Sequence, residues 1–171
     1  MAQPPDAEVA APTADRTASA PPTVLDRAVV AAPTMMYAIK QVELASRALL
    51  DEIVRPEGIT ALQYTAMTVL QRHRDPLSSA DLARLSFVRA QSMTDLVGGL
   101  ERRGLVAKRP DPANRRRLLI GLTADGSALL ERLAPMVSRL EQRMLSGLTA
   151  GERADLARLL DATRRNLTSP R

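Results

Sequence analysis

The residues whose types and spacing most clearly indicate a chemical role are the basic side chains between Leu100 and Arg117. This segment contains seven basic residues and two acids, and a proline-rich turn separates the basic residues into two clusters. Over residues 102–117, the seven cations less Asp111 give +6, so this segment carries all of the chain's formal net charge of +5. Localised positive charge is typical of proteins that bind a polyanion, most simply nucleic acid. Because an isolated basic run is more often a solvated surface loop, the interpretation depends on the elements that position it.

The residue types that enzymes and metal sites need are scarce. The chain has no cysteine, which excludes disulfides, thiolate nucleophiles, cysteine-zinc sites and thiol-based sensing of oxidants within it. Its single histidine, His73, lies between Arg72 and Arg74 in a polar turn. The sequence shows no glycine-rich phosphate loop and no close pair of carboxylates in an apolar setting. We therefore predict a protein that is not an enzyme, with no catalytic residues, no metal site and no cofactor.

Length and composition favour one helical domain. A chain of 171 residues is long enough to bury a core, and aromatic residues make up only 2% of it, with no tryptophan. The core must then consist of Leu, Val, Ala, Ile and Met, which favours helices. No run reaches the roughly 18 apolar residues that a membrane span needs, and the N-terminus lacks the features of a signal peptide. We expect a soluble, cytoplasmic protein without a membrane partner.

The first 33 residues differ in composition from the rest of the chain. They contain six of the twelve prolines and ten alanines, and almost no large apolar residue occurs before Val24. Such a segment cannot bury enough apolar surface to offset the entropy lost on ordering. We predict a disordered Ala/Pro-rich tail over 1–33, order from near Thr34, and a short C-terminal tail over 168–171.

Beyond this tail, apolar residues recur at helical spacing in several stretches. The clearest is 90–103, where four apolar residues form one stripe and polar residues lie away from it. The predicted helices span 34–54, 61–72, 80–85, 90–103, a long stretch from Thr123 to at least Met144 with a bend at Pro135, and 150–167. The predicted N-caps are Thr60, Ser78 or Ser79, Thr123 and Thr149, and Gly104 is predicted to end the helix 90–103.

Two short strands are predicted between the fourth and fifth helices. They span 105–109 and 118–122 and flank the turn Asp111-Pro112-Ala113-Asn114. In the second strand, we expect Leu118, Ile120 and Leu122 to face inward, with Arg117 and Leu119 outward. The pair therefore forms a hairpin with basic residues at its tip.

This order of elements, helices followed by a hairpin with a basic tip, is that of a winged helix-turn-helix. We therefore predict a mainly α fold with a small β-hairpin wing. In such a fold the second helix of the helix-turn-helix enters the major groove, which at about 12 Å wide admits one α-helix. The hairpin residues Arg115 and Arg116 would reach phosphates or the minor groove. The candidate base-reading residues, exposed and polar in the first half of 90–103, are Gln91, Ser92, Thr94 and Asp95.

Five sequence motifs occur in order along the chain. They are Gly58-Ile59-Thr60-Ala61-Leu62-Gln63-Tyr64, Ser79-Ala80-Asp81-Leu82-Ala83, Gln91-Ser92-Met93-Thr94-Asp95-Leu96-Val97, Leu100-Glu101-Arg102-Arg103-Gly104-Leu105-Val106, and Asp111-Pro112-Ala113-Asn114-Arg115-Arg116 followed by Leu122-Thr123-Ala124-Asp125-Gly126. Through these motifs and their spacing, roughly residues 35–167 resemble the multiple-antibiotic-resistance regulator (MarR) family of winged-helix transcription factors.

The resemblance implies a sequence-specific regulator of transcription, commonly a repressor, that binds double-stranded DNA as a homodimer at a palindromic operator. It implies a winged helix-turn-helix at about 57–122 within a MarR-type domain over 34–167, with N- and C-terminal dimerisation helices at about 34–54 and 123–167. The sequence agrees, because these helices carry more large apolar residues than a small winged domain can cover. The candidate DNA-binding residues are Ser79, Arg89, Gln91, Ser92, Thr94, Asp95, Arg102, Asn114, Arg115, Arg116 and Arg117.

The resemblance also implies release from DNA by a small molecule, often an aromatic acid, that binds between the dimerisation helices and the winged lobe. Tyr37, Arg47 and His73 are candidate effector-binding residues. A partly buried tyrosine, a surface arginine and a solvated loop histidine are the more common explanations of these three residues. The chain also lacks the tryptophan associated with urate sensing in one branch of the family.

Two positions depart from the family's usual pattern. The wing usually carries Asp-x-Arg, and Asn114 occupies the position of this aspartate, so we expect Arg116 to be held less firmly. Arg89 occupies the start of the helix 90–103, where a small capping residue is common; this loses a cap worth about 1 kcal/mol and adds a cation near phosphate. In the same helix, Gly98 and Gly99 suggest close approach by a neighbouring element.

A winged domain can also serve as a protein-interaction module, with its basic tip bound to an acidic partner and no specific DNA binding. The two functions differ in their response to competitors. Specific operator binding should survive excess random DNA, whereas an interaction module should leave no footprint.

Overall fold

The computed structural model describes residues 34–73 and 75–168 of the chain. Within them the fold is mainly helical, with a small three-stranded antiparallel sheet in the order β1-β3-β2. This confirms the predicted mainly α fold with a hairpin wing. The predicted N-terminal tail, and all but the first residue of the predicted C-terminal tail, lie outside the described residues.

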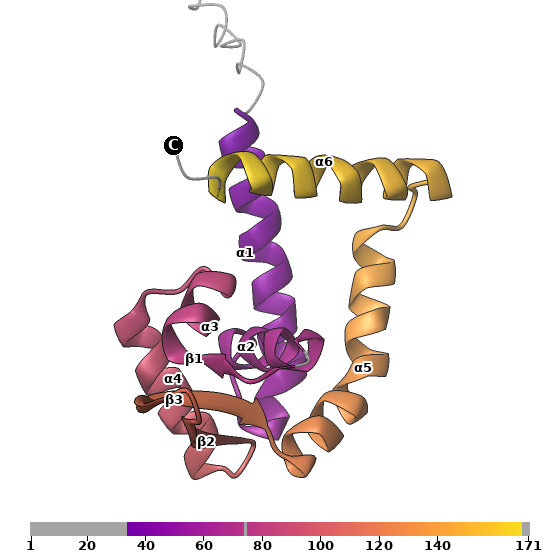
Figure 1. Ribbon diagram of the computed structural model, residues 1–171. Coiled ribbons are helices and arrows are strands. Elements are labelled where there is room, and N and C mark those ends of the chain that lie inside the picture. The colour runs from indigo at the N-terminus through magenta and orange to yellow at the C-terminus, as the bar shows by residue number, and fades with distance from the viewer. Residues whose placement is uncertain (1–33, 74, 169–171) are drawn as a thin grey trace, which may run out of the picture.

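All of the predicted helices are present, and no end differs from the predicted one by more than one residue (Figure 1). The helices are α1 Met35–Val54, the 3₁₀ helix η1 Arg55–Glu57, α2 Ala61–Arg72, α3 Ser79–Leu85, α4 Ala90–Arg102, α5 Ala124–Met144 and α6 Ala150–Thr168. The strands are β1 Leu77–Ser78, β2 Val106–Asp111 and β3 Asn114–Leu122. The helices α2, α3 and α4 and the sheet form a winged lobe, from which α1 and α5 extend.

Side-chain caps determine where the helices of the winged lobe begin. Thr60 Oγ1 accepts from the backbone N–H of Gln63 at 3.2 Å, and Gln63 Oε1 accepts from the backbone N–H of Thr60 at 3.0 Å, so α2 begins with a capping box. Ser78, rather than Ser79, caps α3 by accepting from the backbone N–H of Asp81 at 3.1 Å. Each cap satisfies a backbone donor that the helix leaves open, which is worth about 1 kcal/mol.

The core lies where α2, α3, α4, the sheet and the first half of α5 meet. The predicted apolar stripe of α4 is buried in this core. The largest fully buried side chains are Met67, Leu82, Met93, Leu100, Ile120 and Leu133. Burial of each such side chain contributes about 1.5–3 kcal/mol. The core is therefore aliphatic, as the scarcity of aromatic residues predicted.

The sheet contains more residues than predicted. β1 is not among the predicted strands, because two residues are too few to show an alternating pattern. The hairpin strands are also longer, because Asp111 Oδ1 accepts from the N–H of Ala113 at 2.9 Å and the turn uses only Pro112 and Ala113. The segment 114–117, predicted to begin in the turn, therefore lies in β3.

The inward face of β3 is shorter than predicted. Ile120 is buried and Leu122 packs against the core, but Leu118 is 48% exposed. β1 pairs with β3 only at Leu119 and Ile120. Leu118 precedes these two residues, so it lies in the part of the wing that extends beyond the core. The prediction that Leu118 faces the core is wrong for this reason.

Helix α5 meets the winged lobe at a close contact in its first turn. Thr123 Oγ1 donates to the Gly104 carbonyl at 2.6 Å, and the Thr123 N–H donates to the Leu105 carbonyl at 3.2 Å. Thr123 Oγ1 also caps α5 by accepting from the N–H of Gly126 at 3.0 Å. A Cβ placed on Gly126 would lie 2.1 Å from the carbonyl oxygen of Leu105. Only glycine fits at this position without movement of the backbone.

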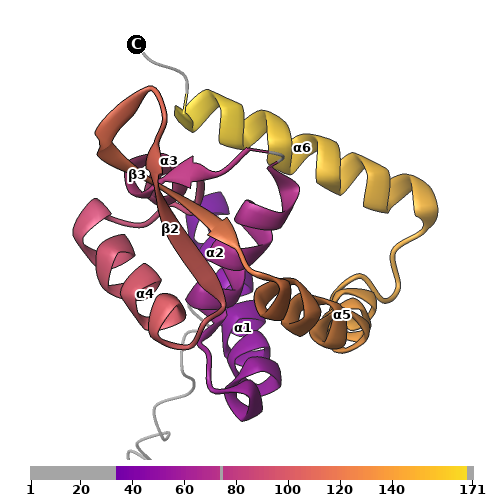
Figure 2. The same ribbon diagram turned by 60° about the horizontal axis from the view of Figure 1, so that its bottom comes forward.

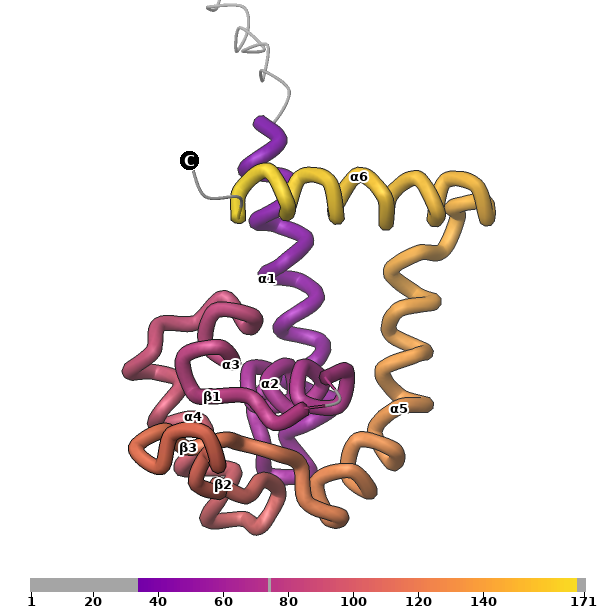
Figure 3. Tube along the Cα trace, viewed as in Figure 1, coloured from indigo at the N-terminus to yellow at the C-terminus, as the bar shows by residue number. Residues whose placement is uncertain are grey.

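Beyond this corner, the helices α5 and α6 leave the lobe. Pro135 lies inside α5, and Figure 3 shows the helix axis changing direction partway along, as predicted. Helix α6 follows the far end of α5 (Figure 2) and stands apart from the winged lobe (Figure 1). It has no buried residue, so its leucines face solvent in the single chain.

We expect Gly126→Ala to destabilise the protein, because the added methyl group cannot fit against the Leu105 carbonyl unless α5 moves. Overpacking of this kind costs about 1–3 kcal/mol, and each kcal/mol lowers Tm by about 2–4 °C in a chain of this size. Gly151→Ala is the matched control, because nothing lies within 4 Å of its Cβ position. Thermal unfolding followed by circular dichroism measures both variants. An unchanged Tm for Gly126→Ala would contradict the close contact.

Candidate nucleic-acid interface

Helix α4 has one buried apolar face and one exposed polar face. Because the apolar face packs into the core, the direction of the opposite face is fixed. The predicted base-reading residues are all exposed, and they are Gln91, Ser92, Thr94 and Asp95. Thr94 Oγ1 donates to the Ala90 carbonyl at 3.1 Å, so its hydrogen is used within the helix while its lone pairs stay available.

Cations lie at both ends of α4. Arg89 is the N-cap residue and forms no side-chain cap hydrogen bond, as its type predicted, and it is exposed. Arg102 is exposed in the last turn. Ser79, predicted to contact DNA from the preceding helix, is the first residue of α3 and is half-buried.

Gly99 allows α2 and α4 to approach each other. A Cβ on Gly99 would lie 2.9 Å from the side-chain Nε2 of Gln63, the residue that completes the capping box of α2. A Cβ on Gly98 would meet only the Arg102 guanidinium, at 3.6 Å. The close approach expected from the sequence therefore accounts for Gly99, and nothing in the structure accounts for Gly98.

The wing carries its arginines on β3. Arg115 and Arg116 are both exposed there. Asn114 Oδ1 accepts from the backbone N–H of Arg116 at 3.2 Å. Asn114 therefore stabilises the wing backbone, and this hydrogen bond does not orient the Arg116 guanidinium.

Three cations of the basic segment have partners within the protein. The pairs are Arg103 Nη2 with the Glu57 carbonyl at 2.6 Å, Lys108 Nζ with Glu101 Oε2 at 2.7 Å, and Arg117 Nη2 with Asp81 Oδ2 at 2.7 Å. These contacts join the end of α4 to η1, β2 to α4, and β3 to α3. Arg117, predicted to bind DNA, is thus engaged by the helix-turn-helix itself.

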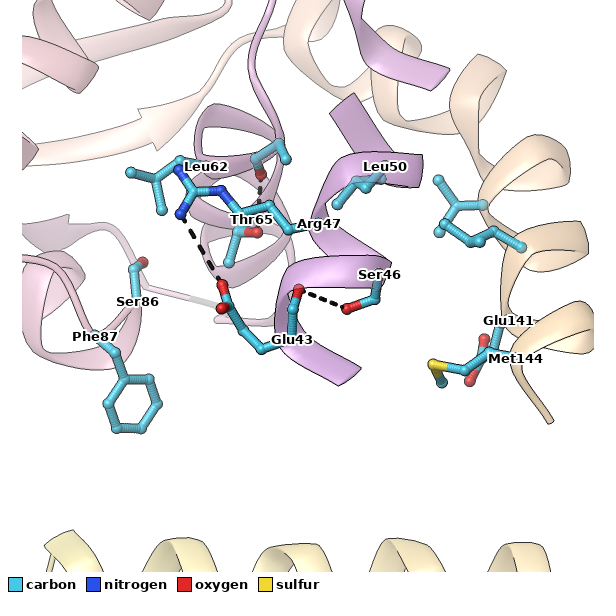
Figure 4. A pocket seen from close by; sticks show the side chains of 13 residues that line it. Glu43, Ser46, Arg47, Leu50, Leu62, Thr65, Ser86, Phe87, Glu141 and Met144 are labelled. Atoms are coloured by element: carbon cyan, nitrogen blue, oxygen red, sulfur yellow. Dashed lines mark hydrogen bonds and ion pairs between the residues drawn. The ribbon is translucent and has the colours of Figure 1, made fainter. Parts of the chain in front are cut away.

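A cavity of about 520 Å³ lies between α1, α2 and α5, with the loop between α3 and α4 on one side (Figure 4). Its volume falls within the range of about 300–1,000 Å³ that is usual for small-molecule sites. Much of its lining is apolar and includes Leu50, Leu62, Val137 and Leu140. Arg47, a predicted effector-binding residue, lines it, with Nη1 4.0 Å from Glu43 Oε1.

The other two predicted effector-binding residues lie elsewhere. Tyr37 is near the start of α1, is 55% exposed, and its hydroxyl accepts from Gln41 Nε2 at 2.8 Å. His73 is exposed at the C-cap of α2. Neither residue lines the cavity, so the structure does not bring the three together.

The loop between α3 and α4 adds two lining residues that the sequence did not indicate. Ser86 is 7% exposed, and its buried hydroxyl has no hydrogen-bond partner among the described residues. Phe87 has a φ of 55° and is 70% exposed. Strained backbone and unsatisfied polar groups concentrate at functional sites. The one sequence signal is that Phe87 is the chain's single phenylalanine.

Two further kinds of site are absent from 34–73 and 75–168. No group of three or more His, Cys, Asp or Glu residues there could hold a metal ion. No helix in these ranges combines the length and apolar character needed to cross a membrane. Acidic side chains such as Asp81, Glu101 and Asp161 lie instead beside arginines or lysines.

Several known proteins are similar to this chain in sequence and in architecture. The model of the MarR family matches residues 57–117. The HTH-type transcriptional repressor NicR of Pseudomonas putida is 32% identical over 60% of this chain and 64% of its own length. The multiple antibiotic resistance protein MarR of Escherichia coli is 31% identical over 66% of this chain and 78% of its own length. The crystal structure of an Escherichia coli MarR mutant complexed with operator DNA is 28% identical, with a TM-score of 0.66 over 74% of this chain and 90% of that one.

An exposed polar helix beside a basic hairpin, on a small helical lobe, defines a winged helix-turn-helix DNA-binding protein. The chain belongs to the MarR family, and it is a DNA-binding transcription regulator. Because its relatives are regulators of transcription, it is not an enzyme, as the sequence predicted.

We expect Arg115→Ala combined with Arg116→Ala to weaken binding to every duplex. The slope of log K against log salt concentration should flatten by up to about 1.8, because each lost phosphate contact removes about 0.9. Fluorescence anisotropy of labelled duplexes over a sodium chloride series measures this slope. Arg55→Ala with Arg72→Ala is the matched control, since it removes the same charge from exposed positions outside the wing, α4 and the proposed dimer helices. If the wing variant kept the wild-type slope, the wing would not touch phosphate.

Proposed function

We propose that two copies of this chain bind one palindromic duplex as a transcriptional repressor, and that a small molecule in the cavity between α1, α2 and α5 releases them. The observation that carries this proposal is the polar face of α4, exposed on the winged lobe next to a wing with exposed arginines. A major groove about 12 Å wide admits one α-helix. Helix α4 is the element of the lobe that suits this groove.

The exposed residues of α4 can distinguish bases by their hydrogen-bonding groups. Gln91 can form paired hydrogen bonds with an adenine edge, and Asp95 can accept from a cytosine amine. Ser92 can bond to several bases, because a hydroxyl both donates and accepts. Thr94 donates its hydrogen to the Ala90 carbonyl, so it can only accept from a base. We propose that these side chains read the sequence of each half-site.

Phosphate contacts would fix the lobe on the duplex without reading its sequence. Arg89 and Arg102 flank the polar face of α4, and the Ser79 hydroxyl lies at the start of α3. Arg115 and Arg116 extend from the wing, and they would bind phosphates or enter the narrow minor groove. Asn114 would act indirectly, by holding the wing backbone that carries them.

The apolar residues that a single chain leaves exposed support a homodimer. Helix α6 has no buried residue, and the first half of α1 is largely exposed. Monomeric proteins rarely leave so much contiguous apolar surface in water. The exposed set comprises Met35, Met36, Ile39, Val42 and Leu44 on α1, Met144 on α5, and Leu156, Leu159, Leu160 and Leu167 on α6. A two-fold dimer would cover these residues and present two lobes to half-sites about one helical turn apart.

DNA binding and dimerisation are assigned to different parts of the chain. A winged lobe over about 57–122 binds DNA, and the helices at about 34–54 and 123–167 form the dimer, within one domain over 34–167. We propose that this domain acts in the cytoplasm. Its relatives come from bacteria, in which the DNA lies in the cytoplasm.

The cavity supports the effector part of the proposal. The apolar part of the lining suits a small aromatic molecule. Arg47, the one cation among the described residues of a lining that also contains Glu43 and Glu141, is the group that would bind a negative charge on it. Ser86, whose buried hydroxyl has no hydrogen-bond partner among the described residues, also borders this cavity. The cavity lies between α1 and α5, which belong to the proposed dimer, and α2, which belongs to the lobe. A ligand there would favour one arrangement of the two lobes over another.

Selection of bound duplexes from a random pool tests the proposed function. We expect an inverted repeat whose half-sites are centred about 10 base pairs apart, and a mass by light scattering of two chains per duplex. Gln91→Ala should change the preferred base at one position of each half-site, at a cost of about 1–3 kcal/mol. Equal losses on selected and random duplexes would exclude base reading by Gln91. Enrichment of no motif, or a complex with one chain, would overturn the proposal.

We expect small aromatic carboxylates to release the selected duplex, and Arg47→Gln to raise the concentration needed by about tenfold or more, because a charged hydrogen bond is lost. Lys40→Gln is the matched control, since Lys40 pairs with the same Glu43 at 2.7 Å but does not line the cavity. Val137→Phe should block release by filling the cavity. Duplex release that neither Arg47→Gln nor Val137→Phe alters would place the effector elsewhere.

A further inference from the structure

Asp81 of α3 is the centre of a small charged cluster. Its Oδ2 accepts from the Ser78 hydroxyl at 2.6 Å and from Arg117 Nη2 at 2.7 Å, and its Oδ1 accepts from Arg84 Nη2 at 3.3 Å. The Ser78 hydrogen bond, followed by the contacts with Arg84 and Arg117, lowers the pKa of Asp81. The carboxylate is therefore charged throughout the neutral range.

Arg117 reaches this cluster from the wing. It lies in β3, 36 residues from Asp81 in sequence, and its Nε also lies 3.9 Å from Asp111 Oδ2 on the opposite wing strand. Its guanidinium is thus held between a carboxylate of the wing and a carboxylate of the helix-turn-helix. A side chain in this position connects the two parts that would contact DNA.

Few other contacts fix the outer part of the wing. β1 pairs with β3 only at Leu119 and Ile120, and the residues from 112 to 118 are exposed. β2 and β3 pair with each other, but an irregularity between Pro110 and Asp111 interrupts their register. A two-stranded hairpin is at best marginally stable by itself. The angle between the outer wing and α3 therefore depends on the contact that Arg117 makes.

We propose that Arg117 is a positioning residue, which sets the angle of the wing through Asp81 and does not itself contact DNA. The inference rests on the proposed function, in which Arg115 and Arg116 meet the backbone while α4 lies in the major groove. Both contacts can form together only if the wing has the right angle to the helix-turn-helix. An exposed ion pair adds little to global stability, so its loss should change DNA binding more than Tm.

A distance measurement on the free protein tests the positioning without DNA. Because the chain has no cysteine, Ala113→Cys at the wing turn and Ala80→Cys on α3 allow two spin labels without background. In protein diluted with unlabelled chain, Arg117→Gln should broaden or shift the distance distribution measured by pulsed electron paramagnetic resonance. Arg84→Gln is the matched control, since it removes from the same carboxylate an arginine that belongs to α3. An unchanged distribution with Arg117→Gln would overturn the proposal, whatever the protein does with DNA.

The duplex enriched by the wild-type protein provides a second test, in which the sign of the effect is decisive. Asp81→Asn removes a negative charge near DNA, so electrostatics alone would strengthen binding. We expect instead a loss of about twofold to fivefold, because the wing loses its anchor. Arg117→Gln should lose a similar factor with an unchanged salt slope, and the double variant should bind no more weakly than either single one. Arg117→Lys, which keeps the charge, should retain most of the affinity.

The opposite result would identify Arg117 as a phosphate contact. In that case Arg117→Gln would lower the salt slope by about 0.9, and Asp81→Asn would strengthen binding. Thermal unfolding of each variant shows whether the fold is retained. If the wild-type protein enriches no duplex, the proposed function fails, and the distance measurement still decides whether Arg117 positions the wing.

Discussion

The contact between Gly126 and the Leu105 carbonyl joins the end of α4 and the base of the wing to the start of α5. At this corner α4 has just ended, β2 begins, β3 ends and α5 starts. Thr123 bonds to the carbonyls of both Gly104 and Leu105, and the backbone of α5 at Gly126 lies against the backbone of Leu105, the residue before β2. Because these contacts join the first turn of α5 to the end of α4, we expect a rotation of α5 to move α4 and the wing with it. A ligand between α1, α2 and α5 that rotates α5 would therefore change the position of α4 and the wing, the parts proposed to contact DNA.

The basic segment also shows why net charge overstates the number of contacts with a polyanion. Arg103, Lys108 and Arg117 each have a partner within the protein, and these partners tie α4 to η1, β2 to α4, and the wing to α3. Arg115 and Arg116 are exposed on β3. Some of the basic residues thus hold the elements of the lobe together, and others are exposed where they could bind DNA. Charge count alone cannot separate these uses, because both place cations in the same stretch of sequence.

The sequence predicts the helices well because their signals are local. The apolar stripe of α4 and the Thr60 and Thr123 caps lie within a few residues of the helices that they define. Prediction from the sequence fails where a contact joins residues that are far apart in the chain. The ion pair of Arg117 with Asp81 joins residues 36 apart. The exposure of Leu118 depends on how far β1 reaches.

In the candidate site, too, the features with local sequence signals could be predicted and those built from distant residues could not. The polar residues of α4 could be assigned from periodicity, because burial of one helix face exposes the other. The cavity could not be assigned, since three helices and a loop build it from residues as far apart as Glu43 and Met144. The left-handed backbone of Phe87 and the Ser86 hydroxyl, which has no partner within 34–73 and 75–168, are also not visible in the sequence.

The lack of any buried residue in α6 has a consequence for how the protein behaves at low abundance. An isolated helix of this length is marginal in water, so its order must come from packing against something else. If a second copy supplies that packing, chain folding and chain pairing become one equilibrium, and stability rises with protein concentration. Newly made, solitary chains would then be the form most open to proteolysis. Silencing of a target gene would begin only once synthesis outpaces that turnover.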